Sequence, residues 1–262
     1  MPEPIKYEIQ NGLAVLCLDS PETRNALSFK TLEDLSYALK LISNDSEAKV
    51  AVLTATEPAF SAGMDLKNIH LDDAYEATQF ADLLSEVYRD LLRLPIPLLC
   101  GVDGKALGGA VGIVLAADMV FVGPKAEFAF PEVKVGLVPA LVSVVAKRRI
   151  HPGQLSGMAL TGIAANAEIA VRLGLADSLS ARSATKDILT YGRKLCLENS
   201  AEAMRRTKKF LQADSLANLE QDLALASQEF QIAVNTRAAK TGLQAFRDKR
   251  PIVWTEGFEE LQ

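Results

Sequence analysis

Pro97-Leu-Leu-Cys-Gly-Val-Asp-Gly-Lys-Ala-Leu-Gly-Gly-Ala-Val-Gly-Ile-Val-Leu-Ala-Ala-Asp118 is the stretch that decides the fold. It begins as an apolar strand, breaks at Asp103-Gly104 and resumes as a helix of small residues that starts at Gly108-Gly109. A strand that leads into such a helix points unpaired backbone N–H groups and the positive end of the helix dipole at one place. Glycine would let a ligand approach that backbone, because it has no Cβ. On its own the stretch favours a simpler interpretation, in which the small residues only let helix and sheet pack closely.

The segments around this stretch alternate between strands and helices. Residues 5–18 predict a β-hairpin that turns at Asn11-Gly12, and Ser28 is a suitable N-cap for a helix. Further strands are expected at 50–54, 119–122 and 127–130, and a long helix after Asp72-Asp73 with Phe80 and Leu84 facing inward. From Pro139 onward the pattern is mostly helical, at about 139–149, 153–160, 166–174, 184–198, 200–213 and 215–235. We therefore expect an α/β core over residues 1–195 that carries the site, followed by a helical region over 196–262.

Composition and charge exclude several classes of protein. The 262 residues are 49% apolar and 23% charged, which is ordinary for a folded protein. A net charge of −5 gives no electrostatic footprint for nucleic acid, and no apolar run is long enough to span a membrane. The first residues do not have the layout of a signal peptide, and the three separated cysteines resemble buried free thiols. We expect a cytoplasmic protein that binds neither nucleic acid nor a membrane.

Several well-known catalytic patterns are missing. Ser61 lies in Phe60-Ser-Ala-Gly63, which lacks the first glycine of a nucleophile elbow. His70 and His151, the only histidines, are expected at the surface or in capping positions. With so few histidines and scattered cysteines, no metal site is expected. The glycines after Gly104 fit neither a P-loop nor a dinucleotide-binding turn.

Three short stretches form a set, because each lies where a predicted strand ends. They are Ala62-Gly63-Met64-Asp65-Leu66, Leu107-Gly108-Gly109-Ala110 and Phe130-Pro131-Glu132-Val133. Ligand crevices in α/β proteins tend to form at strand ends. Two tight turns of small residues could direct backbone N–H groups at one oxygen, and a nearby carboxylate could move protons.

At this point the sequence resembles the crotonase (enoyl-CoA hydratase/isomerase) superfamily. The segments that carry the resemblance follow the order and spacing of that family over nearly the whole chain. They are Arg24-Asn-Ala-Leu27, Phe60-Ser-Ala-Gly-Met-Asp-Leu66, Ala106-Leu-Gly-Gly-Ala110 with Ala117-Asp118, Phe130-Pro-Glu-Val-Lys-Val-Gly-Leu137 and Phe246-Arg-Asp-Lys-Arg-Pro251.

The resemblance implies a fold, a substrate class and an assembly. The implied fold is a spiral of ββα turns with C-terminal helices that form a trimer, often as a dimer of trimers. The implied substrates are acyl-CoA thioesters. Coenzyme A is then part of the substrate, and no separate cofactor is expected.

The resemblance also assigns roles to residues by position. The backbone N–H groups of Met64 and Gly109 would form an oxyanion hole, and Glu132 would be the catalytic acid and base. Phe246 and Lys249 resemble C-terminal residues that reach the CoA of a neighbouring subunit. The full set of residues implied in substrate or CoA binding is Arg24, Ala26, Leu27, Ala62, Asp65, Leu66, Gly108, Pro131, Phe246 and Lys249.

Within the family the chemistry follows the positions of the acids. Hydratases usually carry one glutamate at the position of Gly112 and a second at that of Glu132. Dienoyl isomerases, some hydrolases and aryl-CoA dehalogenases carry an aspartate at the position of Ala140. This chain keeps one acid of the three, Glu132, for which Phe128, Phe130, Val133 and Leu137 are the expected apolar walls.

One carboxylate suffices to move a double bond, so the sequence favours isomerisation of 3-enoyl-CoA to 2-enoyl-CoA somewhat over hydration. Hydration of a 2-enoyl-CoA remains the first alternative, because the run from Pro131 to Ala140 looks like certain branched-chain enoyl-CoA hydratase relatives. A catalytically inactive relative that binds acyl-CoA or acts as a scaffold is the second alternative. Residues 68–80 are expected to shape the acyl pocket.

Overall fold

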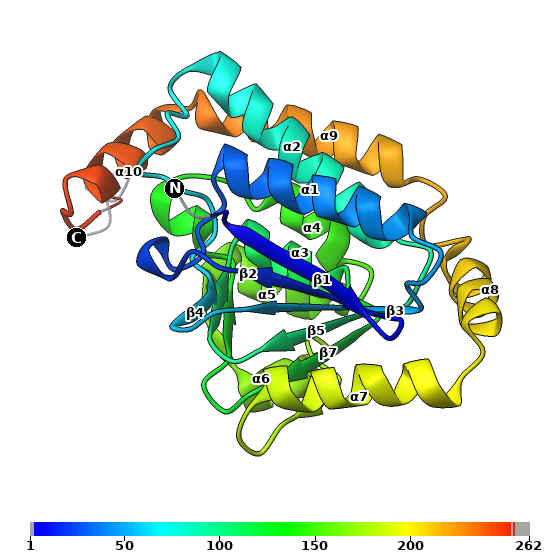
Figure 1. Cartoon of the computed structure of the whole chain (residues 1–262). Helices are drawn as coiled ribbons and strands as arrows, with labels where there is room; N and C mark the ends of the chain where they lie inside the picture. Colours follow the sequence, from blue (N-terminus) through cyan, green and yellow to red (C-terminus); the bar gives the residue numbers. More distant parts are fainter. Residues whose placement is uncertain (1–2, 253, 255–262) are drawn as a thin grey trace.

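The computed structural model describes residues 3–252 and 254, which fold around two sheets (Figure 1). Met1 and Pro2, on which the expected absence of a signal peptide partly depends, lie outside the described residues. The larger sheet has the order β1-β2-β3-β5-β7-β10, and the smaller sheet has the order β4-β6-β8-β9. The mixed α/β class expected from the sequence is confirmed.

The larger sheet contains most of the strands that the sequence predicts. Its strands are β1 (Ile5–Gln10), β2 (Leu13–Leu18), β3 (Val50–Ala55), β5 (Leu98–Val102), β7 (Met119–Val122) and β10 (Ser178–Leu179). β1 and β2 form the expected hairpin, and all other pairs in this sheet are parallel. Asn11 and Gly12 both have positive φ, as the tight turn requires.

The smaller sheet is the part that the sequence analysis did not foresee as a sheet. It consists of β4 (Ala59–Ser61), β6 (Lys105–Leu107), β8 (Glu127–Ala129) and β9 (Ala165–Asn166). β4, β6 and β8 run parallel to one another, and β9 pairs with β8 in the antiparallel sense. The segment 57–67, in which the sequence predicted no strand, therefore contains one, β4.

The chain builds the two sheets in a repeating order, which confirms the expected ββα spiral. Three times, a strand enters the larger sheet, the next strand enters the smaller sheet, and a helix follows. The three repeats are β3-β4-α2, β5-β6-α3 and β7-β8-η2-α4. Each repeat therefore contributes one strand end to the edge of the smaller sheet.

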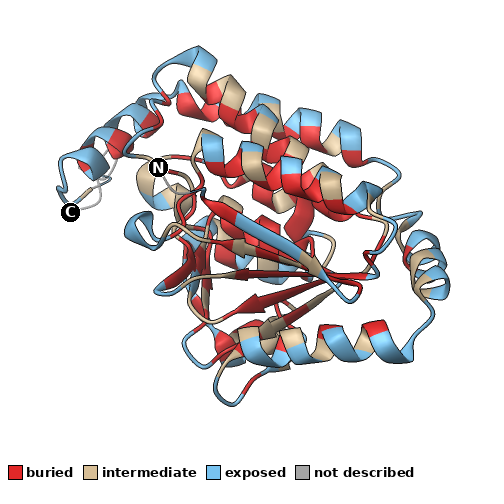
Figure 2. Ribbon diagram, in the orientation of Figure 1, coloured by how far each residue is buried: buried red, intermediate tan, exposed pale blue. Residues whose placement is uncertain are grey.

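Helices cover both faces of the larger sheet. Figure 1 shows α1 and α2, with α9 beside them, on one side of the strands and α7 on the other. α1 and α7 contact strands of this sheet directly, whereas α2 and α9 pack mainly on other helices, and the outer faces of all four are exposed (Figure 2). The helices are α1 (Phe29–Asn44), α2 (Ala74–Leu92), α3 (Gly109–Leu115), α4 (Ala140–Ala146), α5 (Pro152–Thr161), α6 (Ala167–Leu173), α7 (Ala184–Glu198), α8 (Ala201–Gln212), α9 (Leu219–Val234) and α10 (Arg237–Arg247), with 3-10 turns η1 (Pro21–Thr23) and η2 (Pro131–Val135).

The expected division after residue 195 falls inside α7, a helix that packs on β3 and β5. Asp103, at the break in the central stretch, caps this helix by accepting hydrogen bonds from the N–H groups of Ala184 (2.6 Å) and Thr185 (3.0 Å). α7 is thus tied to the strands, although no strand follows β10 among the described residues, and α8 to α10 come after Glu198. α9 then returns to pack against α2 and α4.

The cysteines and histidines lie much as the sequence suggested, except that Cys17 is half-buried and not fully buried. Cys17, Cys100 and Cys196 are free thiols. His151 caps α5 by accepting a hydrogen bond from the N–H of Gly153, and His70 is exposed. Among the described residues, no helix combines the length and apolar character needed to cross a membrane.

Candidate active site

Three loops that are far apart in sequence meet at one edge of the smaller sheet. β4, β6 and β8 are parallel neighbours, so their carboxyl ends lie side by side. β4 leads into Ala62-Gly63-Met64, β6 into Gly108-Gly109, and β8 into Pro131-Glu132 after Phe130. Residues of all three loops line a single cavity of about 270 Å³. The spiral thus brings together the three stretches that the sequence analysis singled out.

The first loop is held by a parallel bridge between Leu27 and Met64. The N–H of Leu27 donates to the carbonyl of Gly63 (2.8 Å), and the carbonyl of Leu27 accepts from the N–H of Asp65 (3.2 Å). In a parallel bridge the N–H of the residue between these two partners points away from the other strand. The N–H of Met64 is accordingly unpaired within the part of the chain that the structure describes.

Gly63 lets this loop touch the second one. Its φ of +79° favours glycine, and a Cβ at this position would lie 2.7 Å from the carbonyl oxygen of Leu107. Any larger residue would push apart the loops that follow β4 and β6. The close approach of Met64 and Gly108-Gly109 therefore depends on the absence of a side chain at position 63.

The second loop places the first peptide of α3 against the cavity. The N–H of Gly108 donates to the carbonyl of Ala129 (2.9 Å), which extends the β6–β8 pairing by one residue. Gly109 is the first residue of α3, so its N–H has no partner one turn earlier. Among residues 3–252 and 254, nothing accepts a hydrogen bond from this N–H.

Glu132 follows on the third loop, in the first turn of η2. The residue as a whole is half-buried, but its Oε2 is shielded from solvent and has no hydrogen-bond partner among the described residues. Burial raises the pKa of the Glu132 carboxyl from 4.5 to about 7. A carboxyl with this pKa can accept or donate a proton near neutral pH.

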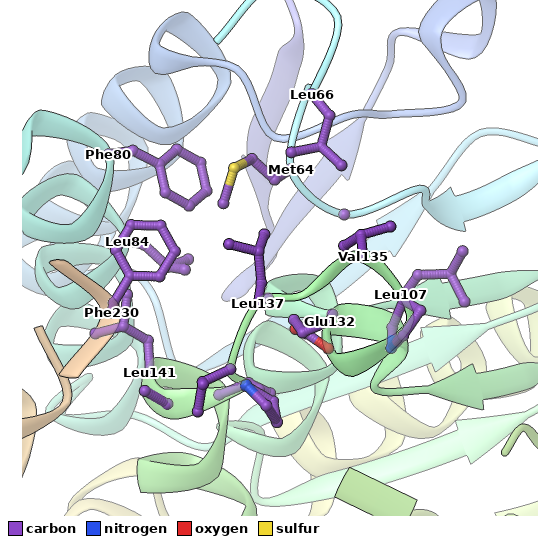
Figure 3. Close-up of a pocket in the computed structure, with 18 of the residues that line it drawn as sticks. Met64, Leu66, Phe80, Leu84, Leu107, Glu132, Val135, Leu137, Leu141 and Phe230 are labelled. Atoms are coloured by element: carbon purple, nitrogen blue, oxygen red, sulfur yellow. The ribbon is translucent and has the colours of Figure 1, made fainter. Parts of the chain in front are cut away.

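The walls around Glu132 differ in part from those predicted. Leu137 lines the cavity as expected, and Leu107 and Val135 join it beside the carboxyl (Figure 3). Phe128 and Phe130 are fully buried in the core and do not line the cavity, and neither does Val133. Side chains along β8 alternate between the two faces of the strand, which explains why Phe128 is buried. Val135 faces the cavity because η2 turns the chain.

The other end of the cavity is apolar and comes from helices. Phe80 of α2 and Phe230 of α9 face one another there, with ring centroids 6.3 Å apart. Figure 3 shows Phe80, Leu84 and Phe230 together, away from Glu132. The complete lining is Ala62, Gly63, Met64, Leu66, Phe80, Leu84, Leu107, Gly108, Gly109, Pro131, Glu132, Val135, Leu137, Val138, Pro139, Ala140, Leu141, Val142, Phe230 and Phe246.

Eight of the predicted site residues line this cavity, and five do not. Those that line it are Glu132, Met64, Gly109, Ala62, Leu66, Gly108, Pro131 and Phe246, and those that do not are Arg24, Ala26, Leu27, Asp65 and Lys249.

Four of these five support the first loop or lie close behind it. The carbonyl of Arg24 accepts a hydrogen bond from the N–H of Ala62 (2.9 Å), and Leu27 forms the bridge to Met64. Ala26, between them, is buried at 8% exposure. Asp65 turns its carboxylate away from the cavity to accept a hydrogen bond from the Asn68 side chain (2.7 Å).

The two C-terminal residues lie at or beside the cavity. Phe246 of α10 lines the cavity of its own chain, and the contact with the CoA of a neighbouring subunit that the resemblance implies stays a prediction. Lys249 lines an adjoining hollow with Lys134, Arg250 and Trp254, and Phe246 borders both spaces.

Sequence reasoning missed most of the apolar end. It included Phe80 only as the last residue of the segment 68–80, placed Leu84 on the inner face of a helix without assigning it to the pocket, and did not single out Leu141 or Phe230. The spacing of Phe80, Leu84 and Tyr88 at every fourth residue marks one helix face that passes along the site. Of the segment 68–80, Phe80 lines the cavity, whereas Tyr75 is 73% exposed.

Only one carboxyl group lies among the described residues that line the cavity, that of Glu132. Ala140 lines the cavity at the start of α4 and carries no acid. Gly112 is buried in α3, where a Cβ would lie 2.4 Å from the hydroxyl oxygen of Tyr88. Within the described residues, no group of three or more His, Cys, Asp or Glu side chains is placed to hold a metal ion.

Comparison with known proteins gives matches over nearly the whole chain. The family model described as Enoyl-CoA hydratase/isomerase matches residues 8–257. A short-chain-enoyl-CoA hydratase from Clostridium acetobutylicum is 28% identical over 254 residues, which is 96% of each chain. A trans-2-decenoyl-[acyl-carrier-protein] isomerase from Streptococcus mutans is 27% identical over 253 residues, covering 94% of this chain and 95% of the other. The crystal structure of an enoyl-CoA hydratase/isomerase from Mycobacterium paratuberculosis superimposes with a TM-score of 0.87 at 26% identity, covering 93% of this chain and 98% of the other.

Proposed function

Because the chain belongs to the enoyl-CoA hydratase/isomerase family of the crotonase superfamily, we propose that it moves the double bond of a 3-enoyl-CoA to the 2-position with Glu132 as its single acid and base. The N–H groups of Met64 and Gly109, which have no partner among the described residues, would bind the thioester oxygen. One observation carries this proposal. Among the described residues that line the cavity, Glu132 has the one carboxyl group, and the rest of the lining consists of apolar side chains and backbone.

The proposed oxyanion hole answers the main energetic difficulty of the reaction. The C2 proton of a thioester is a much weaker acid than a carboxyl group, so removing it requires stabilisation of the enolate oxygen. Two main-chain N–H groups can supply this, and losing one such donor typically costs about 3–4 kcal/mol in the transition state. The identity of the Met64 side chain matters little for this role, because the donor is the backbone.

The proposed proton transfer balances with one carboxyl group. The Glu132 carboxylate takes a proton from C2, and the electron pair moves to the thioester oxygen as a dienolate. The protonated carboxyl then returns a proton at C4, so that the double bond lies between C2 and C3. The raised pKa of Glu132, about 7, suits both steps, and its buried Oε2 has no protein partner to displace among the described residues.

Hydration of a 2-enoyl-CoA is the second candidate function. The short-chain-enoyl-CoA hydratase from Clostridium acetobutylicum matches 96% of this chain, which favours it. Hydration requires a water molecule to be oriented as the nucleophile while C2 gains a proton. With Gly112 and Ala140 at the other two positions, Glu132 would have to do this alone. This is why isomerisation is the preferred proposal.

Assembly and location are also proposals. We propose a homotrimer or a dimer of trimers, which is supported by large apolar side chains that α8 and α9 leave exposed in the single chain, among them Phe210 (81%) and Ile232 (63%). We propose that the protein acts in the cytoplasm on a CoA thioester and uses no cofactor beyond the CoA of its substrate.

The decisive experiment supplies a 3-enoyl-CoA and a 2-enoyl-CoA separately and follows both products, together with exchange of the C2 proton in heavy water. The proposal expects conversion of the 3-enoyl-CoA, and loss of about 10²–10⁴-fold in rate in Glu132→Gln. Glu127→Gln is the matched control, because Glu127 pairs with Lys105 at the start of β8, outside the cavity. An unaffected Glu132→Gln variant would reject the assignment, and binding of acyl-CoA without exchange would indicate the inactive relative.

A further inference from the structure

Tyr88 of α2 is a buried polar side chain next to the site that the proposed reaction does not use. Its side chain is fully buried, and its hydroxyl donates a hydrogen bond to the carbonyl oxygen of Gly109 (2.7 Å). Gly109 is also the residue whose N–H, at the cavity, has no partner in the described part of the chain. The phenol therefore holds the carbonyl group of Gly109, and the N–H of the same residue is left for the cavity.

Gly108 and Gly109 need such a restraint, because two successive glycines have more backbone freedom than any other pair. The N–H of Gly108 is fixed by the carbonyl of Ala129 (2.9 Å), which holds the chain on the strand side. The Tyr88 hydroxyl holds the next carbonyl on the helix side. The peptide that carries the Gly109 N–H lies between these two hydrogen bonds, so its direction is set by both.

Gly112 leaves the space that Tyr88 occupies. A Cβ at position 112 would lie 2.4 Å from the Tyr88 hydroxyl oxygen and 2.5 Å from the ring carbon that carries it. These atoms belong to a fully buried ring, which has little room to move aside. Glycine at 112 and tyrosine at 88 are therefore a matched pair in this fold.

Tyr88 also stays a donor throughout the working pH range. Burial raises the pKa of the Tyr88 hydroxyl well above 10, and the charge of Glu132 adds to the effect. Both groups adjoin the Gly108-Gly109 turn, since a Cβ on Gly108 would lie 2.9 Å from Oε1 of Glu132 and a Cβ on Gly109 would lie 3.5 Å from the Tyr88 hydroxyl. Its proton is committed to the Gly109 carbonyl.

We propose that Tyr88 is a positioning residue that holds the Gly109 peptide with its N–H directed at the substrate oxygen, and that Gly112 is required to admit it. This inference rests on the proposed function, since the substrate oxygen is that of the thioester. Tyr88 touches no reacting atom. Its effect is on the alignment of the donor, which matters more for an enolate than for a neutral thioester.

The test is Tyr88→Phe, which removes one oxygen atom and preserves the ring. We expect kcat for the 3-enoyl-CoA to fall about tenfold while KM changes less than about twofold, because the lost alignment acts mainly on the transition state. Tyr37→Phe is the matched control, because Tyr37 lies 64% exposed on α1 and outside the cavity. If Tyr88 only filled space, Tyr88→Phe would keep the wild-type kcat, and the inference would be wrong.

A spectroscopic measurement tests the same point without turnover. Hexanoyl-CoA with a ¹³C-labelled thioester carbonyl reports donor strength through the lowering of its infrared C=O frequency on binding. We expect a smaller lowering in Tyr88→Phe than in the wild type, and likewise in Gly112→Ala, which retains the hydroxyl but displaces the ring. Equal lowering in all three proteins would overturn the inference.

The outcomes separate this inference from the function on which it rests. Loss of activity in Glu132→Gln with an unchanged Tyr88→Phe rejects the role of Tyr88 alone. Unchanged activity in Glu132→Gln, or no binding of hexanoyl-CoA by the wild type, rejects the proposed function and this inference with it.

Discussion

The two ends of the cavity are built from different material. The end at Glu132 consists mainly of backbone at the carboxyl ends of three short parallel strands, with one titratable side chain among the described residues that line it. The opposite end consists of apolar side chains from α2, α4 and α9, such as Phe80, Leu141 and Phe230. Backbone direction depends on φ, ψ and hydrogen bonds, whereas a side-chain wall depends on size and shape. The difference suggests that changes at the first end alter the reaction, and changes at the second alter which substrate is accepted.

The most severe test of this comparison is a single added methyl group at the backbone end. Gly108 has φ +54° and ψ −128°, a conformation open essentially to glycine, and a Cβ there would lie 2.9 Å from Oε1 of Glu132. Gly108→Ala should therefore disturb the Gly109 N–H and the carboxylate together. We expect kcat to fall by roughly 10²–10³, the range seen when one oxyanion donor is lost.

Gly157→Ala supplies the control for that measurement, because a Cβ on Gly157 of α5 would meet nothing within 4 Å. Its kinetics should match those of the wild type. If Gly108→Ala retained full kcat with an unchanged melting temperature, the backbone end would not control the reaction, and the contrast between the two ends would fail.

A second prediction concerns the stability of the backbone end. The Glu132 pKa is about 7 in the folded chain and 4.5 for an ordinary glutamate, so between these values the folded state binds more protons than the unfolded state. The free energy of unfolding must then decrease as pH rises from about 4.5 to 7, by at most about 3 kcal/mol from this group. Glu132→Gln lacks that decrease, so relative to the wild type it should be more stable at pH 8 than at pH 4.

Urea unfolding of both proteins at pH 4, 5.5 and 8 measures this effect. A difference between the two proteins that stays constant over this range would show that the carboxyl is not held in a desolvated position. If Glu132→Gln were more stable than the wild type and had lost activity, the burial of Glu132 would lower the free energy of unfolding for the benefit of the reaction.

The third prediction is the pH dependence of the reaction. The free enzyme needs Glu132 as a carboxylate to accept the C2 proton, so kcat/KM should rise with pH up to about 7 and then level off. At one pH unit below the pKa, about a tenth of the carboxyls are ionised, so the rate should be about tenfold below the plateau. The measurement is kcat/KM for a 3-enoyl-CoA from pH 5 to 9, and a flat profile would contradict the role of Glu132 as base.

The sequence predicted one end of the cavity better than the other, for physical reasons. Met64, Gly109 and Glu132 could be identified because turns that need glycine, proline and a lone acid leave local marks in the sequence. The segments 119–122 and 184–198 were also predicted with the bounds that β7 and α7 have, since their apolar patterns are continuous. These features depend on neighbours within a few residues.

What could not be predicted depends on contacts between distant segments. β4 and β6 have only three residues each, too few for a periodic pattern, and they exist because they pair with each other. α10 lies within the helical region predicted for 196–262 but was not predicted as a separate helix, and Gly242 in its interior disfavours one. In the structure a Cβ on Gly242 would lie 2.2 Å from the carbonyl oxygen of Val135, so the glycine is needed for α10 to pack on η2. The facing of Phe80 and Phe230 likewise joins segments 150 residues apart.

That aromatic pair offers the mildest way to sharpen the comparison. Phe230→Leu removes ring atoms from the apolar end while Glu132, Met64 and Gly109 stay in place. The space beside Phe80 should then admit a longer acyl chain. We expect kcat/KM to rise roughly several-fold for a longer 3-enoyl-CoA and to fall for a shorter one, in line with the effect of one or two methylene groups in an apolar pocket. Ile232→Leu, on the exposed face of the same helix, should leave the chain-length preference unchanged.

Because the reacting atoms are untouched, the pH profile of Phe230→Leu should keep its rise toward about pH 7. A shifted pH profile would show that the two ends are coupled, and an unshifted profile with altered chain-length preference would show that the backbone sets the chemistry while the helices select the acyl chain.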